Sequence, residues 1–207
     1  MIRAVAVVSL LSLLVLVLYV PAAHPPERFL MQLRSEHDAA VEFWGRQPAH
    51  RVLDRAMRMQ AGAAEASPIP TVRDMPAASG VNSAVAIEMA SVNQRLFNNA
   101  YFRSVDALLM LASYRLSSLL EWLPWLLPLV LVAAIDGALV RIVRAQEFLH
   151  HDPEMFAVWC SLLIMASCAT VVAFVLPLGL HPASLAAFPV AVAVLLGLAI
   201  ANFHRRA

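Results

Sequence analysis

The sequence predicts an all-α integral membrane protein, with four transmembrane helices and a helical periplasmic hairpin between the first and the second. Hydrophobic residues make up 61% of the 207 residues and charged residues only 14%, whereas about a quarter of a soluble domain is charged. Four apolar runs are also long enough to cross a bilayer core of about 30 Å. These observations exclude a soluble globular protein. The net charge of +1 does not indicate the strongly basic surface of a nucleic-acid-binding protein, so we expect no direct nucleic-acid binding.

The first transmembrane helix is predicted at residues 1–20, as an uncleaved signal anchor. Its apolar run, residues 4–20, has 17 uncharged residues and follows Arg3. Cleavable signal peptides usually have a shorter apolar region, of roughly 7 to 15 residues. The small residues at 21–23 nevertheless leave a cleaved signal peptide as the alternative.

Residues 21–118 are predicted to form a periplasmic helical domain. Apolar side chains recur every three or four residues over 27–44, with Glu36 among the polar residues off the stripe, which indicates an amphipathic helix. Pro48 interrupts this pattern and a shorter helical pattern follows, after which the Gly-, Ala- and Pro-rich stretch near 61–80 predicts a flexible loop. A later stripe meets no helix breaker before the second span. We therefore expect an antiparallel hairpin whose second helix continues into that span as a projecting stalk.

The other spans are predicted at residues 119–140, 155–178 and 183–203, with a cytoplasmic loop at 141–154 and a cytoplasmic tail at 204–207. Basic residues in short loops and near span ends are retained on the cytoplasmic side. With four crossings, five arginines fall on one side: Arg3, Arg141, Arg144, Arg205 and Arg206. We therefore expect a multi-pass protein with both termini in the cytoplasm.

The sequence contains no motif for catalysis or cofactor binding. The histidines and carboxylates at 150–154 have metal-ligand side chains, but adjacent histidines point in different directions and no second pair lies nearby. We interpret them as a solvated cytoplasmic turn. No HExxH motif, defensible Ser/His/Asp spacing or glycine-rich phosphate loop occurs. We expect no enzymatic activity, no cofactor and no metal.

Asp136, followed by Gly137, is the one acidic residue well inside a predicted span. Carboxylates inside a membrane are costly, and are by default suspected of serving an ion path or a contact between helices. Asp136 lies only five residues, about 7 Å, from Arg141, close to the cytoplasmic interface. A structural polar contact is therefore favoured over a transport role.

The outer end of the same span carries a group of interface residues. Arg115 and Glu121 flank this end. Trp122 and Trp125, three residues apart on one helix face, are typical of the aromatic belt at a membrane boundary. Pro124, with a second proline four residues later, predicts a kink at the start of the span.

Small residues recur every four positions in the fourth span, around Gly197, and this spacing lets another helix approach closely. The third span offers a similar series and is the nearest candidate partner. Packing within the chain is the simpler interpretation, and a homo-oligomer face is the alternative. The structural or interaction candidates are thus Arg103, Arg115, Glu121, Trp122, Pro124, Trp125, Asp136, Gly137, Arg141 and Gly197.

Three segments resemble a known family: residues 102–109, residues 114–125, and residues 134–137 followed by Arg141. Across 97–145 the chain resembles an uncharacterised membrane-protein family carried by integrating conjugative elements, whose genes are typically found with type IV secretion and coupling-protein genes. The resemblance implies the inner membrane of a Gram-negative donor cell and a role in conjugative DNA transfer. That family has no assigned activity or catalytic residue, so the resemblance supplies a context and no site.

These observations together predict an accessory or scaffold inner-membrane component of a conjugative type IV secretion apparatus. Expected partners are membrane lipid, other membrane proteins of the apparatus, the coupling ATPase through the loop at 141–154, and further copies of the chain. One alternative is a small transporter or ion-conducting oligomer, with Asp136 as its titrating group and Pro124 and Pro128 as its gate. Another is an entry-exclusion protein that acts in recipient cells.

Overall fold

The computed structural model describes residues 2–66, 99–146 and 153–203, and the secondary structure of these ranges is entirely helical. The predictions for the cytoplasmic tail, most of the loop after the second span, and the stripe between residues 82 and 98 lie outside the described residues. The described residues form six helices: α1 (Ile2–Ala23), α2 (Pro26–Trp44), α3 (Arg46–Ala66), α5 (Ala100–Gln146), α6 (Pro153–Val175) and α7 (Pro182–Ala201). Helices α1, α5, α6 and α7 are long and apolar enough to cross a membrane, which confirms the all-helical fold with four such helices.

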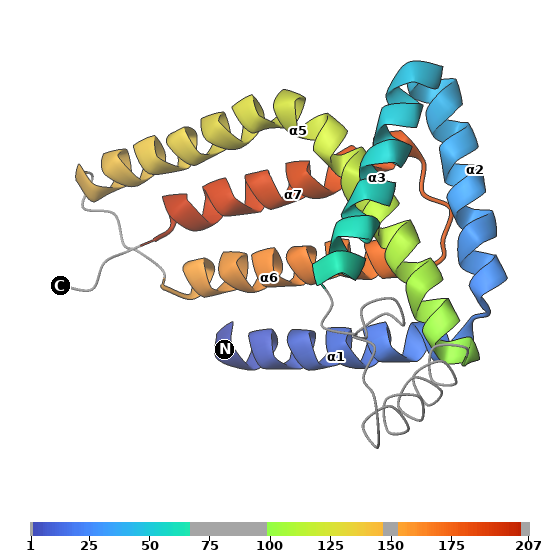
Figure 1. Ribbon diagram of the computed structural model, residues 1–207. Coiled ribbons are helices and arrows are strands. Elements are labelled where there is room, and N and C mark those ends of the chain that lie inside the picture. The colour runs from blue at the N-terminus through green and yellow to red at the C-terminus, as the bar shows by residue number, and fades with distance from the viewer. Residues whose placement is uncertain (1, 67–98, 147–152, 204–207) are drawn as a thin grey trace, which may run out of the picture.

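The four apolar helices lie side by side as a row (Figure 1). Helix α1 packs against α6, α6 packs against α7, and α7 packs against the second half of α5. Helices that are apolar all round, as these are, suit a lipid surrounding. Among the described residues, the two end members of the row, α1 and the second half of α5, each have a neighbouring span on one side only.

Helix α5 continues from the amphipathic region into the apolar span without interruption, as predicted, and is 47 residues long. It bends sharply near Pro124 and Pro128, which lie inside the helix. Proline removes a backbone donor and clashes with the preceding turn, so a bend at this position has an ordinary cause. The first half of α5 does not project as a stalk. It runs across one end of the row, against α2 and α3.

Helices α2 and α3 complete this crosswise arrangement. The chain turns between them at Gly45, whose φ of +86° is a left-handed conformation that suits glycine. The break therefore falls at Gly45, whereas Pro48 lies in the first turn of α3, where proline is tolerated. Helix α3 also extends over residues 61–66, part of the predicted loop. We call α2, α3 and residues 100–121 of α5 the capping layer.

One apolar cluster joins the capping layer to the row, and a second lies within the capping layer. The first joins the outer ends of α1 and α6 to α2 and α5, and its buried members are Val20, Phe29, Ala107, Leu108, Leu111 and Val175. The second lies between α3 and α5 and contains Val52, Ala56 and Tyr114. The capping layer is therefore packed onto the end of the row and shares a core with it.

The small residues of the fourth span pack against the second span. A Cβ added to Gly197 would lie 2.7 Å from the carbonyl oxygen of Ala133, and a Cβ added to Gly137 would meet the backbone of Gly197. The third span was the expected partner of Gly197, so the structure assigns this contact differently. This close approach joins two spans of the same chain.

Candidate functional site

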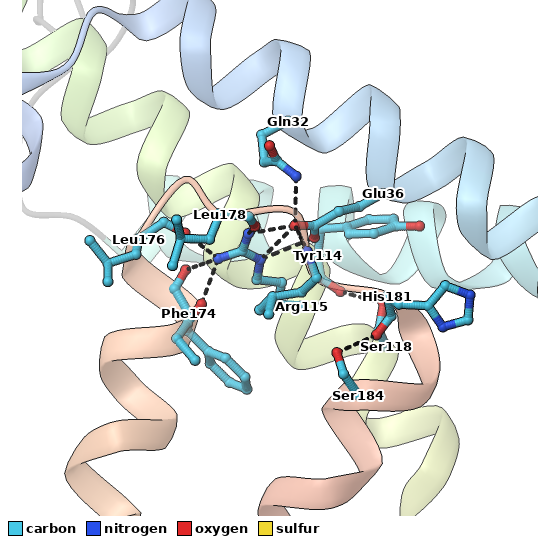
Figure 2. Close-up of polar contacts among 12 residues, drawn as sticks. Gln32, Glu36, Tyr114, Arg115, Ser118, Phe174, Leu176, Leu178, His181 and Ser184 are labelled. Carbon is cyan, nitrogen blue, oxygen red and sulfur yellow. Dashed lines mark hydrogen bonds and ion pairs between the residues drawn. The ribbon is translucent and has the colours of Figure 1, made fainter.

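The most distinctive site in the described residues is a buried ion pair between α5 and α2. The side chain of Arg115 is 0% exposed and that of Glu36 is 4% exposed. The Nε atom of Arg115 lies 3.1 and 3.0 Å from the two carboxylate oxygens of Glu36, and Nη2 also donates to Oε1. Figure 2 shows the two side chains facing each other between the helices. This fork geometry matches the planar guanidinium to a carboxylate.

Arg115 also caps the end of α6. Its Nη1 donates to the carbonyl oxygens of Ala173 at 2.6 Å, Phe174 at 3.2 Å and Leu176 at 2.6 Å. Its Nη2 donates to the carbonyl oxygen of Leu178 at 2.6 Å. The last carbonyls of a helix have no partner within that helix and carry partial negative charge. A buried cation at this position both satisfies these oxygens and neutralises them (Figure 2).

Glu36 extends the network to the turn between α6 and α7. Its Oε1 accepts hydrogen bonds from the side chain of Gln32 at 3.2 Å and from the backbone N–H of Leu180 at 3.3 Å. Three nitrogens of Arg115 and both oxygens of Glu36 are thus engaged. We call this network the Arg115 joint, because it connects α2, α5, α6 and the turn at residues 176–181.

A second set of polar contacts fixes α3 on α5. Arg51 and Arg55 form ion pairs with Glu121 at 3.3 and 3.1 Å, and Arg55 also donates to the carbonyl oxygen of Ser117 at 3.2 Å. The buried hydroxyl of Ser117 donates to the carbonyl oxygen of Val52 at 2.8 Å. Glu121, predicted as an interface residue, therefore binds another helix of the same chain.

Aromatic side chains mark the level at which α5 bends. The rings of Phe43, Trp44, Trp122 and His181 form a cluster with centroid separations of 5.4 to 6.2 Å. The indole N–H of Trp122 donates to the carbonyl oxygen of Pro182, at the start of α7, at 3.1 Å. Trp125 is different, because it is 80% exposed. The two tryptophans thus have separate surroundings, one within the chain and one on its surface.

The other sequence candidates lie away from the joint. Arg103 and Asp136 are exposed, and Asp136 has no hydrogen-bond or ion-pair partner within the described part of the chain. Gly137 is buried against α7. The guanidinium of Arg141 lies 4.9 Å from the ring centroid of Phe203. These residues therefore do not form one site with Arg115.

Arg115 was predicted to lie at a membrane interface and Glu36 on a polar helix face, whereas both side chains are buried in the structure. The helical spacing of residues along α2 could have indicated that Glu36 is buried. Glu36 follows Phe29 by seven residues and precedes Ala40 by four, which places it on the same helix face as these buried residues. The partner carbonyls of residues 173–178 have no side-chain signature, so sequence reasoning could not have found them.

The chemistry of the joint is electrostatic. Among residues 2–66, 99–146 and 153–203, no group of three His, Cys, Asp or Glu side chains is placed to hold a metal ion. Arg115 and Glu36 already satisfy each other, and the nearby Tyr114 hydroxyl lies 3.4 Å from Nδ1 of His37. The geometry of this site is suited to holding helices in register.

Comparison with known proteins identifies the family. A model of the DtrJ-like family, described as IncC plasmid conjugative DNA transfer protein DtrJ-like, matches residues 51–204. No curated protein and no solved structure matches the chain. The matched region contains most of α3 and all of α5, α6 and α7, and therefore Arg115, whereas Glu36 lies before it. The match confirms the predicted link to conjugation, and the chain belongs to the DtrJ-like family of conjugative DNA transfer proteins.

Proposed function

We propose that this protein is a structural component of a conjugative type IV secretion apparatus, located in the bacterial inner membrane. The observation that carries the proposal is the Arg115 joint, in which a fully buried arginine clamps the capping layer onto the turn between two spans. Family membership supplies the process, conjugative DNA transfer. A layer fixed in this way, with its charges already paired, suits a scaffold better than an enzyme.

The distribution of arginine supports a periplasmic position for the capping layer. The first turn of α1, which contains Arg3, and the last turns of α5, which contain Arg141 and Arg144, are at the ends of these helices that lie away from the capping layer (Figure 1). Arg144 donates to the side chain of Asn202 at 2.9 Å, beside the end of α7. Basic residues near span ends favour the cytoplasmic side, and this preference supports a periplasmic capping layer. Exposed charged residues of the capping layer, such as Arg34 and Asp38, are then available to other envelope proteins.

The first experiment is transfer from a donor with a clean in-frame deletion of this gene, with and without complementation from a plasmid. We expect a fall of orders of magnitude that complementation restores. Unchanged transfer from the deleted donor would contradict the proposal. If expression in recipient cells alone lowers the transfer into them, the protein acts in entry exclusion instead.

The partners are tested by photocrosslinking from the full chain in donor cells. A photoreactive residue at Arg34 or Asp38 is expected to capture an envelope protein of the apparatus, and one at Arg144 the coupling ATPase. A photoreactive residue at Val194, which is 51% exposed on an apolar span, is the control and is expected to capture neither. The same products from all three regions would indicate nonspecific capture.

A further inference from the structure

The row of spans has two open edges that lie within one chain. At one edge, α1 exposes apolar side chains, including Val7 at 56% and Val15 at 66%. At the other edge, the second half of α5 exposes Val132 at 61% and Ile135 at 58%. The spans between them, α6 and α7, each have a helix on both sides. Any lateral assembly that extends the row therefore uses the α1 edge, the α5 edge, or both.

The two edges carry opposite charges. Asp136 is exposed on α5 next to Ile135, and Arg3 is exposed on α1. Neither side chain has a hydrogen-bond or ion-pair partner within the described part of the chain. An exposed carboxylate surrounded by apolar side chains is unusual in a membrane span, because such groups almost always face the interior of a bundle.

The opposite charges also lie at the same level of the row. Gly137, next to Asp136, meets the backbone of Gly197, which lies fifteen residues, or about 22 Å, from Pro182 at the start of α7. On α1, Val17 packs in the cluster at the outer end of α6, and Arg3 lies fourteen residues, or about 21 Å, away in the same direction. The N-terminal end of α1 and the C-terminal end of α5 both lie at the end of the row opposite the capping layer (Figure 1).

We propose that copies of this protein associate side by side, with the α5 edge of one copy against the α1 edge of the next. Asp136 of one copy then faces Arg3 of its neighbour, and the exposed valines on both helices are covered. A second copy is the occupant that the structure supports, because both halves of a charge-complementary interface occur on this chain at matching levels. Such a contact is heterologous, so it builds a ring or an open row of copies. The inference does not depend on the role in conjugation.

The test is cysteine crosslinking between two differently tagged full-length copies in cell membranes. Both copies carry Cys160→Ala and Cys168→Ala, one adds Val7→Cys, and the other adds Val132→Cys. These two positions lie one helix turn from Arg3 and Asp136, toward the capping layer. We expect a disulfide between the two tagged copies when they are oxidised together, and little product from either variant alone.

A matched control uses Val194→Cys in place of Val132→Cys. Val194 is 51% exposed and lies at the level of Val132, because Gly197 contacts residues 133 and 137 on the parallel helix α5. It is on the face of the row and not on its edge. We expect no crosslink from Val194→Cys to Val7→Cys. Equal crosslinking of the control and the edge variant would overturn the proposal.

Charge reversal tests the ion pair itself. Asp136→Arg in the Val132→Cys copy is expected to lower crosslinking severalfold, and Arg3→Asp in the Val7→Cys copy is expected to restore it. Asp136→Asn, which changes the shape of the side chain little, is expected to give an intermediate loss at unchanged protein level. The proposal is overturned by crosslinks only between identical positions, by crosslinks only to other proteins, or by crosslinking that charge reversal does not change.

Discussion

Replacement of Arg115 by methionine tests how strongly the Arg115 joint holds the capping layer. Methionine keeps a long side chain but removes the guanidinium and its positive charge. The carboxylate of Glu36, only 4% exposed, is then left without its counter-ion. The four carbonyl oxygens at the end of α6 and in the following turn also lose their common donor. We expect this single change to destabilise the protein more than any exchange of a surface arginine.

The expected magnitude follows from the burial of the pair. Removal of one partner of a buried ion pair costs about 3–5 kcal/mol, because the remaining charge is desolvated and unpaired. For a chain of this size, 1 kcal/mol corresponds to about 2–4 °C in Tm, so the variant is expected to unfold roughly 6–20 °C lower. The combination of Arg115→Met with Glu36→Leu is expected to cost less than the sum of the single changes, because neither charge is then left alone.

The assay is thermal unfolding of the purified full chain in detergent micelles. Arg51→Met is the matched control, because Arg51 also joins two helices of the capping layer, α3 and α5, through an ion pair but its side chain is 67% exposed. Exposed pairs contribute about 0.2–1 kcal/mol, so the Tm of this variant is expected to stay close to that of the unchanged protein. Equal Tm values for Arg115→Met and Arg51→Met would refute the reasoning.

Two further predictions concern packing at the row and at the bend. Gly197→Ala places a Cβ 2.7 Å from a carbonyl oxygen of α5 and is expected to lower the free energy of unfolding by about 1–3 kcal/mol. Gly62→Ala, whose added Cβ has nothing within 4 Å, is expected to raise it by about 0.5–1 kcal/mol. The unfolding assay in micelles checks both, and equal effects would contradict the close helix contact. Trp122→Phe removes the hydrogen bond to Pro182 and is expected to cost about 0.5–1.5 kcal/mol. Trp125→Phe, at a residue that is 80% exposed, is expected to change stability by less than about 0.5 kcal/mol, and a larger loss than from Trp122→Phe would reverse our assignment of the two rings.

The four apolar helices were predictable because hydropathy acts over whole segments. A run of about 20 apolar residues has few alternatives to a membrane span, and the structure places apolar helices at all four such runs. The continuity of α5 was predictable for a similar reason, since neither glycine nor proline interrupts its first twenty residues. The direction of its first half was not, because a proline kink indicates that a helix bends but not toward which neighbour.

The partners of single residues were much less predictable. Gly197 was identified from small-residue spacing, but that spacing is equally compatible with two neighbouring spans and does not choose between them. Glu36 was assigned to a polar face because charged residues are usually exposed. Its burial depends on Arg115, 79 residues away, and a single sequence gives no information on such a distant pair.

The composition of the Arg115 joint explains why arginine is suited to this position. Lysine has three donors on one nitrogen. It could not bond the carboxylate on α2 and, at the same time, the four carbonyl oxygens at the end of α6 and in the following turn. Because three guanidinium nitrogens of Arg115 are engaged, α2 cannot move away from α5 without separating Glu36 from Arg115, and α5 cannot move away from α6 without removing the donor from the end of α6. A partner that pulls on the capping layer must therefore either break the joint or move the turn between α6 and α7. In a scaffold this connection would transmit force from the capping layer to the spans. Without the Arg115–Glu36 pair, a partner could still bind the capping layer, but its binding would no longer move the membrane helices.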